Sequence, residues 1–142
     1  NFERNKNKSG YMNGISSIFS YEFSNNLFTS VEYSFNKFVA QIESEDYTQR
    51  LLNFSLIKNF PNDYSFSFNF NQLKKNFYKA SFPWPLRRDI GNTITLNISK
   101  LFSQCHNISL GISKSNFNSS VGLYEKKNTS TSADYAYICL GD

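Results

Sequence analysis

The stretch Tyr64-Ser65-Phe66-Ser67-Phe68-Asn69-Phe70-Asn71 decides the fold that the sequence predicts. Aromatic residues occupy every second position, and serine or asparagine fills the positions between them. Because consecutive side chains of a β-strand point to opposite faces, this stretch forms a strand with one aromatic and one polar face. A helix would scatter the same four rings around its circumference.

Six other segments alternate in the same way. The seven predicted strands run over residues 11–23, 27–39, 47–60, 64–73, 90–102, 107–115 and 129–140. Short turns follow the first, third and fifth strands, and long polar connections follow the second, fourth and sixth. This regular order is typical of outer-membrane barrels, which have short periplasmic turns and long outer loops. Strands of about 10–13 residues also suit a tilted membrane crossing.

The composition favours a structure with one apolar and one polar face. Aromatic residues make up 18% of the 142 residues, with 15 Phe and 9 Tyr, yet the mean hydropathy is −0.48. No stretch approaches the roughly 20 apolar residues of a membrane-spanning helix. The net charge of +4 comes from scattered Lys and Arg residues near the predicted loops, so we expect no nucleic-acid partner.

The number of strands predicts a partial barrel. Asn1 is followed by polar and charged residues rather than by the apolar segment of a signal peptide, so we expect a mature or excised piece. Single-chain bacterial barrels have an even number of strands, from eight upwards. The predicted fold is therefore an all-β, antiparallel, up-and-down transmembrane β-barrel, of which residues 1–142 form the C-terminal part and an odd number of strands precede.

Three short motifs resemble the surface lipoprotein assembly modifier (Slam) family. They are Phe82-Pro83-Trp84-Pro85-Leu86-Arg87-Arg88-Asp89, then Ile108-Ser109-Leu110-Gly111 leading to Ser115-Asn116, and finally Leu123-Tyr124-Glu125. Family members carry an arginine-rich loop, a strand, a Ser-Asn segment, a Leu-Tyr-acidic group and a final strand. The resemblance covers residues 82–137. The chain departs from the family in residues 138–142, which follow a candidate terminal aromatic at Tyr137, and in the prolines and tryptophan of the loop.

The resemblance implies a 14-stranded barrel in the bacterial outer membrane, preceded by a periplasmic domain of tetratricopeptide-type helical repeats. This chain would supply the last seven strands. The implied function is to assist the translocation and display of lipoproteins on the cell surface. The implied partners are outer-membrane lipids, a lipoprotein client and the upstream part of the same chain.

Two groups of residues are candidates for contact with a client or with lipid. In the outer loop these are Trp84, Arg87 and Arg88, which suit lipid phosphates or an acidic client. The alternative, which we favour because charged loops are common on barrels, is an arginine pair that snorkels at the rim or bonds loop carbonyls. The predicted lumen-facing residues are Glu22, Glu32, Arg50 and Lys58. These four would line a client or solute path, or form a network that only stabilises the barrel, and we expect the structural role first.

The cysteines and the single histidine carry weaker hypotheses. Cys105 and Cys139 lie at the predicted periplasmic ends of adjacent strands, where a disulfide is possible in an oxidising compartment and two free thiols are the alternative. His106 lies in a predicted turn, away from any concentrated polar set. Because paired carboxylates, a glycine-rich phosphate loop and a metal cluster are all missing from the sequence, we expect no enzyme and no cofactor.

Two other functions remain open. A polysaccharide-export porin would need aromatic and acidic residues in the lumen, whereas the aromatic residues here fall mainly on the apolar face. A soluble β-sandwich that binds a partner would need a second sheet to bury that face, together with shorter strands and less regular loops.

Overall fold

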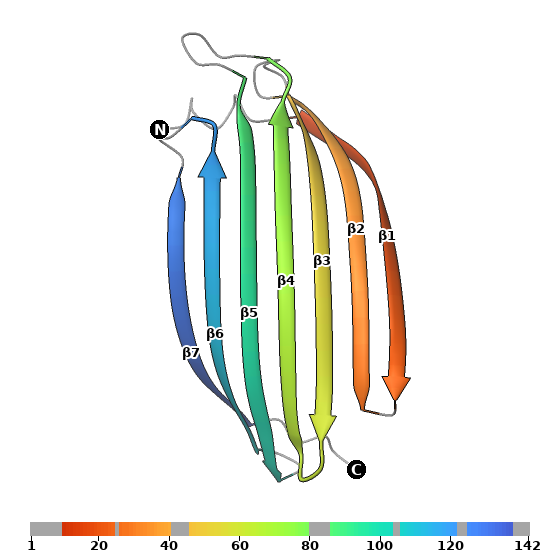
Figure 1. Cartoon of the computed structure of the whole chain (residues 1–142), viewed down its shortest axis with the longest axis vertical. Helices are drawn as coiled ribbons and strands as arrows, with labels where there is room; N and C mark the ends of the chain where they lie inside the picture. Colours follow the sequence, from red (N-terminus) through yellow and green to blue (C-terminus); the bar gives the residue numbers. More distant parts are fainter. Residues whose placement is uncertain are drawn as a thin grey trace.

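The computed structural model describes residues 10–24, 26–40, 46–79, 86–103, 106–121 and 125–137. These residues form one sheet of seven antiparallel strands in chain order (Figure 1). The strands are β1 (Gly10–Ser24), β2 (Leu27–Ala40), β3 (Tyr47–Phe60), β4 (Tyr64–Phe77), β5 (Arg88–Ser103), β6 (His106–Ser119) and β7 (Lys126–Tyr137). The predicted all-β, antiparallel, up-and-down architecture is confirmed. The sheet is open over the described residues, with β1 at one edge and β7 at the other.

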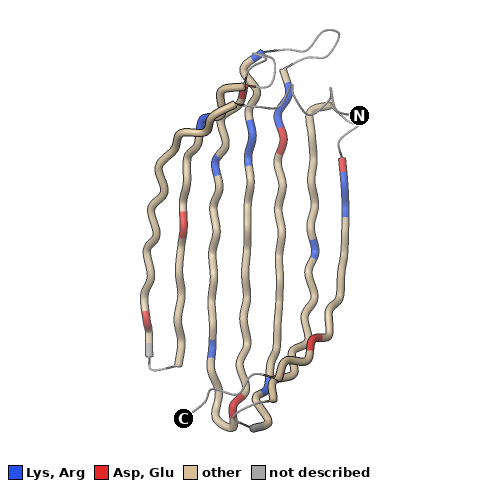
Figure 2. The backbone as a smooth tube through the Cα atoms, turned by 180° about the vertical axis from the view of Figure 1, so that it is seen from behind, with Lys and Arg blue, Asp and Glu red and all other residues tan. Residues whose placement is uncertain are grey.

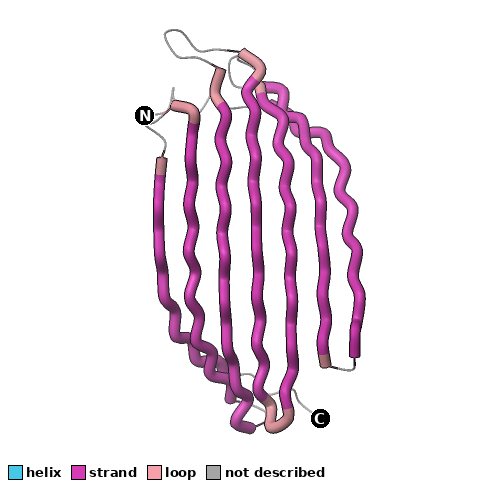
Figure 3. The backbone as a smooth tube through the Cα atoms, in the orientation of Figure 1, coloured by secondary structure: helices cyan, strands magenta, loops and turns pink. Residues whose placement is uncertain are grey.

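Several strands extend further than predicted at the end of the sheet that carries the long connections. β4 continues from residue 73 to Phe77, β5 begins at Arg88, and β6 continues from residue 115 to Ser119 (Figure 3). The apolar alternation stops before these positions, but the ladder of backbone hydrogen bonds continues. Arg88 and Asp89 therefore lie in a strand and not in a loop. We call this end of the sheet the long-connection end, and the opposite end the turn end.

The turn between β3 and β4 has the local chemistry that the sequence predicts. Asn62 and Asp63 adopt φ angles of 63° and 62°, a left-handed conformation that asparagine and aspartate tolerate better than most residues. The carbonyl oxygen of Asp63 also accepts a hydrogen bond from the backbone N–H of Leu101, at 3.0 Å. The turn thus fixes the register in which Phe60 lies opposite Tyr64.

The register gives every strand an apolar face and a polar face. Val31, Phe54, Phe70 and Ile94 are consecutive register partners across β2 to β5, and we call their side of the sheet the apolar face. Their sequence neighbours point to the other side, the polar face, which consists mainly of Ser, Asn and Thr.

The polar face is the more enclosed one. Tyr33 on the apolar face is 46% exposed, whereas the smaller Ser34 on the polar face is only 6% exposed. The same contrast recurs along β6, where Ile108, Leu110 and Ile112 are exposed and the residues between them are half-buried. Side chains crowd together on the inside of a curved sheet, so we infer that the polar face is concave.

Gly111 illustrates how crowded the concave face is. A Cβ atom at Gly111 would lie 2.3 Å from Oδ1 of Asn97 and 2.8 Å from Oγ of Ser132, on the two neighbouring strands. The substitution Gly111→Val is therefore expected to lower the free energy of unfolding by about 1–3 kcal/mol, the usual range for overpacking, although valine favours strands. Denaturant unfolding of the full-length protein in lipid vesicles measures this change. In the matched control Thr131→Val, on the apolar face of β7, stability should be unchanged or higher; equal losses in both variants would contradict a crowded polar face.

No second layer covers the apolar face within the described residues. Substantial contacts between elements occur only between strands that are neighbours in the sheet. The second sheet that a β-sandwich requires is missing from this part of the chain. Among the described residues, no helix is long and apolar enough to cross a membrane.

Candidate functional site

A band of apolar side chains crosses the apolar face and is bounded by cations. In β3, Leu52, Phe54 and Leu56 lie between Arg50 and Lys58, which point to the same face because all five residues have even numbers in one regular strand. The guanidinium of Arg50 lies 5.9 Å from the ring centroid of Phe35 on that face. The prediction that Arg50 and Lys58 share the polar face with Glu22 and Glu32 is therefore wrong. Their spacing of eight residues corresponds to about 27 Å along the strand.

The boundary of this band nearer the long-connection end, which we call the upper boundary, runs obliquely across the strands. On the apolar face of β2 the first cation at this end of the band is Lys37, whereas on the apolar face of β6 it is Lys114. Following the register from Lys114 across the sheet leads to Val31 in β2, six residues nearer the turn end than Lys37. Six residues are about 20 Å along a strand, and four strand spacings are about 19 Å across the sheet. From Lys37 to Lys114 the boundary is therefore inclined by about 45° to the perpendicular of the strands, but the slope is uneven, because Lys74 is level with Arg50 and Arg88 is level with Lys37. From Lys37 in β2 to Lys127 in β7 the boundary descends by four residues over five strand spacings, an inclination of about 30°.

The boundary of the band nearer the turn end, which we call the lower boundary, is inclined in the same direction. The cation at this end is Lys58 in β3 and Lys100 in β5. The register partner of Lys100 through β4 is Phe60 in β3, two residues nearer the turn end than Lys58. The backbone view of Figure 2 shows the charged segments gathered toward the two ends of most strands, with long uncharged stretches between them.

Aromatic rings mark the lower boundary. The ammonium of Lys100 donates a hydrogen bond to Oη of Tyr64 at 2.9 Å and lies 4.8 Å from the ring centroid of Phe102. The ring of His106 stacks near Tyr135, and Nδ1 of His106 lies 2.6 Å from the Tyr135 hydroxyl. His106 thus opens strand β6 beside tyrosines of β7 instead of standing in a turn. Amphipathic rings in such a row suit a boundary between an apolar and a polar medium.

The centre of the polar face holds a ladder of hydrogen bonds around Glu32. Its carboxylate accepts hydrogen bonds from Oγ of Ser16 at 3.3 Å and from Nδ2 of Asn53 at 2.8 Å. Asn71 in turn donates to Oδ1 of Asn53. Four strands are thus tied together on one face, as expected for the structural role that the sequence analysis favoured for Glu32.

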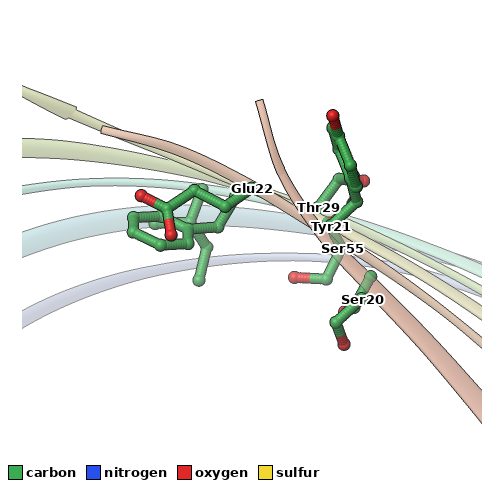
Figure 4. Close-up of a pocket in the computed structure, with 8 residues that line it drawn as sticks. Ser20, Tyr21, Glu22, Thr29 and Ser55 are labelled. Atoms are coloured by element: carbon green, nitrogen blue, oxygen red, sulfur yellow. Dashed lines mark hydrogen bonds between the residues drawn. The ribbon is translucent and has the colours of Figure 1, made fainter. Parts of the chain in front are cut away.

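Glu22 lies on the polar face near the turn end, beside a hollow of about 540 Å³ (Figure 4). Ser20, Ser30 and Ser55 also line this hollow, and Figure 4 shows Tyr21 and Ser20 pointing to opposite sides of β1. The hollow adjoins β1, the edge strand, whose outer side pairs with no described strand. The hollow is therefore open on that side, and we assign it no ligand.

A buried ion pair anchors the polar face at the long-connection end. Asp89 is 1% exposed, and its carboxylate accepts hydrogen bonds from Nε of Arg87 at 2.9 Å and from Oγ of Ser119 at 2.6 Å. Nη2 of Arg87 lies 2.6 Å from the second carboxylate oxygen, so the pairing is bidentate. The backbone N–H of Phe77 donates to the carbonyl of Arg87 at 3.0 Å. These bonds hold the end of the 78–87 connection against β4 and β6.

Aromatic rings continue from this ion pair along the polar face. The guanidinium of Arg87 lies 4.8 Å from the ring centroid of Phe77, and the ring of Tyr47 follows at 5.3 Å from Phe77. Phe38 stacks on Tyr47 at 5.0 Å, and the ammonium of Lys75 lies 4.7 Å from the Tyr47 centroid. We call Phe38, Tyr47, Lys75, Phe77 and Arg87 the inner rim cluster.

The structure separates the residues of the predicted loop site. Arg87 is committed to Asp89 on the polar face, whereas Arg88 is exposed on the apolar face as the register partner of Asn76. Arg87 therefore holds a neighbouring carboxylate, a structural role that differs from both roles weighed for it from the sequence. Trp84, Cys105 and Cys139 lie outside the described residues, so the lipid or client contact of Trp84 and the disulfide remain predictions.

The inner rim cluster was missed from the sequence. Phe38 and Tyr47 lie at the ends of predicted strands, where the alternation weakens, and Phe77 lies in a stretch that was predicted to be a connection. A signal was nevertheless present, because these aromatic residues fall on the polar side of the alternation in their strands.

The described residues offer no arrangement for metal binding: no three His, Cys, Asp or Glu side chains gather in this part of the chain. What the site provides is a wall with an oblique apolar band on one side and hydrogen-bonded polar side chains on the other. Comparisons with protein-family models, with curated proteins and with solved structures find no match to this chain.

Proposed function

We propose that this chain forms part of the wall of a transmembrane β-barrel in a bacterial outer membrane. Its apolar face contacts lipid and its polar face borders an aqueous lumen. The observation that carries the proposal is the oblique apolar band. Strands of outer-membrane barrels tilt by about 35–45° from the membrane normal, so a flat bilayer must cut across them at such an inclination, and the upper boundary here is inclined by about 30° from Lys37 to Lys127 and by about 45° from Lys37 to Lys114.

The height of the band supports the same proposal. The stretch of about 27 Å between Arg50 and Lys58 becomes about 21 Å along the membrane normal when the strand tilts by about 40°. The outward apolar band of such barrels is about 25 Å tall. Arg50 and Lys58 lie at the two edges of the band, where long cationic side chains suit an interface because their apolar stems can lie against lipid while their charged ends reach water. The long connections face the cell exterior in this orientation.

The direction of the edge strands determines what closes the barrel. β1 and β7 both run from the long-connection end to the turn end. A second copy of this sheet related by rotation about the barrel axis would place β7 beside a parallel β1. Closure by antiparallel pairs alone therefore needs an odd number of further strands, which the resemblance to the Slam family supplies as the first half of a 14-stranded barrel.

We further propose that the barrel assists the display of lipoproteins on the cell surface. The support is the resemblance carried by the motifs within residues 82–125, together with a polar wall along which a lipidated client can pass. The test is deletion of the gene, followed by protease treatment of intact cells to measure surface-exposed lipoproteins. We expect a loss of surface exposure, with unchanged total lipoprotein and restoration by the wild-type gene. Unchanged surface exposure would contradict this function while leaving the barrel proposal intact.

Polysaccharide export is the second candidate, and the inner rim cluster favours it. The rings of Phe38, Tyr47 and Phe77 lie on the polar face, which would line the lumen of the proposed barrel, and Lys75 suits an anionic sugar polymer. The double variant Tyr47→Ala/Phe77→Ala distinguishes the two functions in the complemented deletion strain. If polysaccharide export falls while lipoprotein display is retained, the second candidate replaces the first.

A further inference from the structure

The acidic residues and most of the basic residues of the strands lie on opposite faces of the sheet. Within the seven strands, the four acidic residues all lie on the polar face: Glu22, Glu32, Asp89 and Asp134. The apolar face of the same strands carries eight Lys and Arg residues and no acidic residue. The apolar face therefore has a uniformly positive set of charges, although its centre is hydrophobic.

Six of these eight cations lie on the long-connection side of the apolar band. They are Lys37, Arg50, Lys74, Arg88, Lys114 and Lys127, which we call the basic stripe. All six are exposed, and none of them forms an ion pair with another described residue. The other two, Lys58 and Lys100, lie on the turn side. The two boundaries of the band thus differ threefold in their number of cations.

The basic stripe holds like charges close together. Arg50 and Lys74 are direct register partners on β3 and β4, and such a pair has Cβ atoms about 4.5–5.5 Å apart. Like charges directly opposite each other destabilise a sheet. An anion placed between them removes the repulsion and gains charge-assisted hydrogen bonds from both side chains.

We propose that the basic stripe binds the phosphate-bearing headgroups of anionic lipids in the leaflet at the long-connection end. The inference rests on the proposed membrane barrel. A lipid is the occupant that fits, because the stripe follows the edge of the apolar band, where acyl chains would cover the adjacent Phe and Leu side chains while the headgroup meets the cations. A basic residue near an anionic membrane surface strengthens binding by about fivefold.

The test uses the full-length protein in a zwitterionic detergent, titrated with phosphatidylglycerol and, separately, with phosphatidylcholine. Bound lipids are counted by native mass spectrometry. We expect phosphatidylglycerol to be preferred, and the triple variant Lys37→Gln/Arg50→Gln/Lys74→Gln to weaken its binding by at least tenfold. If the triple variant fails to fold, the double variant Lys37→Gln/Lys127→Gln, which leaves Arg50 and Lys74 in place, should still weaken phosphatidylglycerol binding, by a smaller factor.

Two controls separate the outcomes. Lys126→Gln changes the residue beside Lys127 but on the polar face, and should leave lipid binding unchanged. Millimolar inorganic phosphate should not displace the lipid; displacement would identify a free-anion site and overturn the proposal. Equal phosphatidylglycerol binding by the wild-type protein and by the folded stripe variants would also overturn it. Failure of the protein to insert into lipid vesicles would count against the barrel itself, which makes the two failures distinguishable.

Discussion

Replacing Phe68 with arginine is expected to lower the free energy of unfolding of the full-length protein by about 2–4 kcal/mol, the range measured for a cation at the centre of a lipid-facing barrel surface. Phe68 lies in the middle of the apolar band of β4, between its register partners Leu56 and Leu96, and its ring centroid is 6.0 Å from that of Phe54. Denaturant unfolding in lipid vesicles measures the change, and reduced assembly into the outer membrane should accompany it in cells.

The matched control is Asn69→Arg, one residue further along β4 and on the polar face. Asn69 is half-buried, but an arginine there can extend its guanidinium into the water that borders the polar face, so we expect a clearly smaller loss than at position 68. If arginine is tolerated equally at positions 68 and 69, the apolar face does not contact lipid. If it is harmful only at position 69, the two faces have been assigned the wrong way round.

Replacing Asp89 with alanine is expected to destabilise the protein by about 3 kcal/mol. The change would leave the half-buried guanidinium of Arg87 without its bidentate partner and Oγ of Ser119 without its acceptor. Breaking one half of a buried ion pair typically costs about 3–5 kcal/mol, and the partial exposure of Arg87 places this case at the lower end. The denaturant midpoint should fall at an unchanged m-value.

Two further variants, Asp89→Asn and Arg88→Ala, serve as controls for this prediction. Asparagine keeps a carbonyl oxygen for Ser119 but removes the charge, so its effect should lie between those of the wild type and the alanine variant. Arg88 is adjacent but lies on the opposite face, exposed, and its removal should change stability by less than about 0.5 kcal/mol. A loss in Arg88→Ala as large as in Asp89→Ala would contradict the assignment of the anchor to Arg87 and Asp89.

The strand pattern was predictable because it depends on local chemistry. In β4 the aromatic and polar residues alternate strictly, and the turn Pro61-Asn62-Asp63 marks its start, so both the face and the beginning of the strand follow from the sequence. The far end of β4 was not predictable in the same way. Beyond the apolar band, polar and charged residues occur on both faces of β4, so the alternation that identifies a strand is lost although the backbone pairing continues to Phe77.

The predictions for the site residues were likewise correct where they rested on local alternation and wrong or missing where they did not. Glu32 was correctly assigned to the polar face because it lies within a clear alternation. Arg50 and Lys58 were assigned by their charge rather than by their position in the strand, although their even numbers place them with Leu52 and Leu56. The Arg87–Asp89–Ser119 anchor depends on the pairing of β5 with β6. Such a long-range contact is specified by the register of the whole sheet and not by any short motif.

The most direct test of the account is a scan of β4 with nitroxide spin labels. Single cysteines at positions 65 to 70 would be introduced into the full-length protein, with Cys105 and Cys139 replaced by serine, and the labelled proteins reconstituted in lipid vesicles. The accessibility of each label to oxygen, which concentrates in lipid, and to a water-soluble nickel chelate would then be measured. We expect a period of two, with positions 66, 68 and 70 accessible to oxygen and positions 65, 67 and 69 accessible to nickel. Nickel accessibility at the three phenylalanine positions, or protection of all six positions from both reagents, would contradict it.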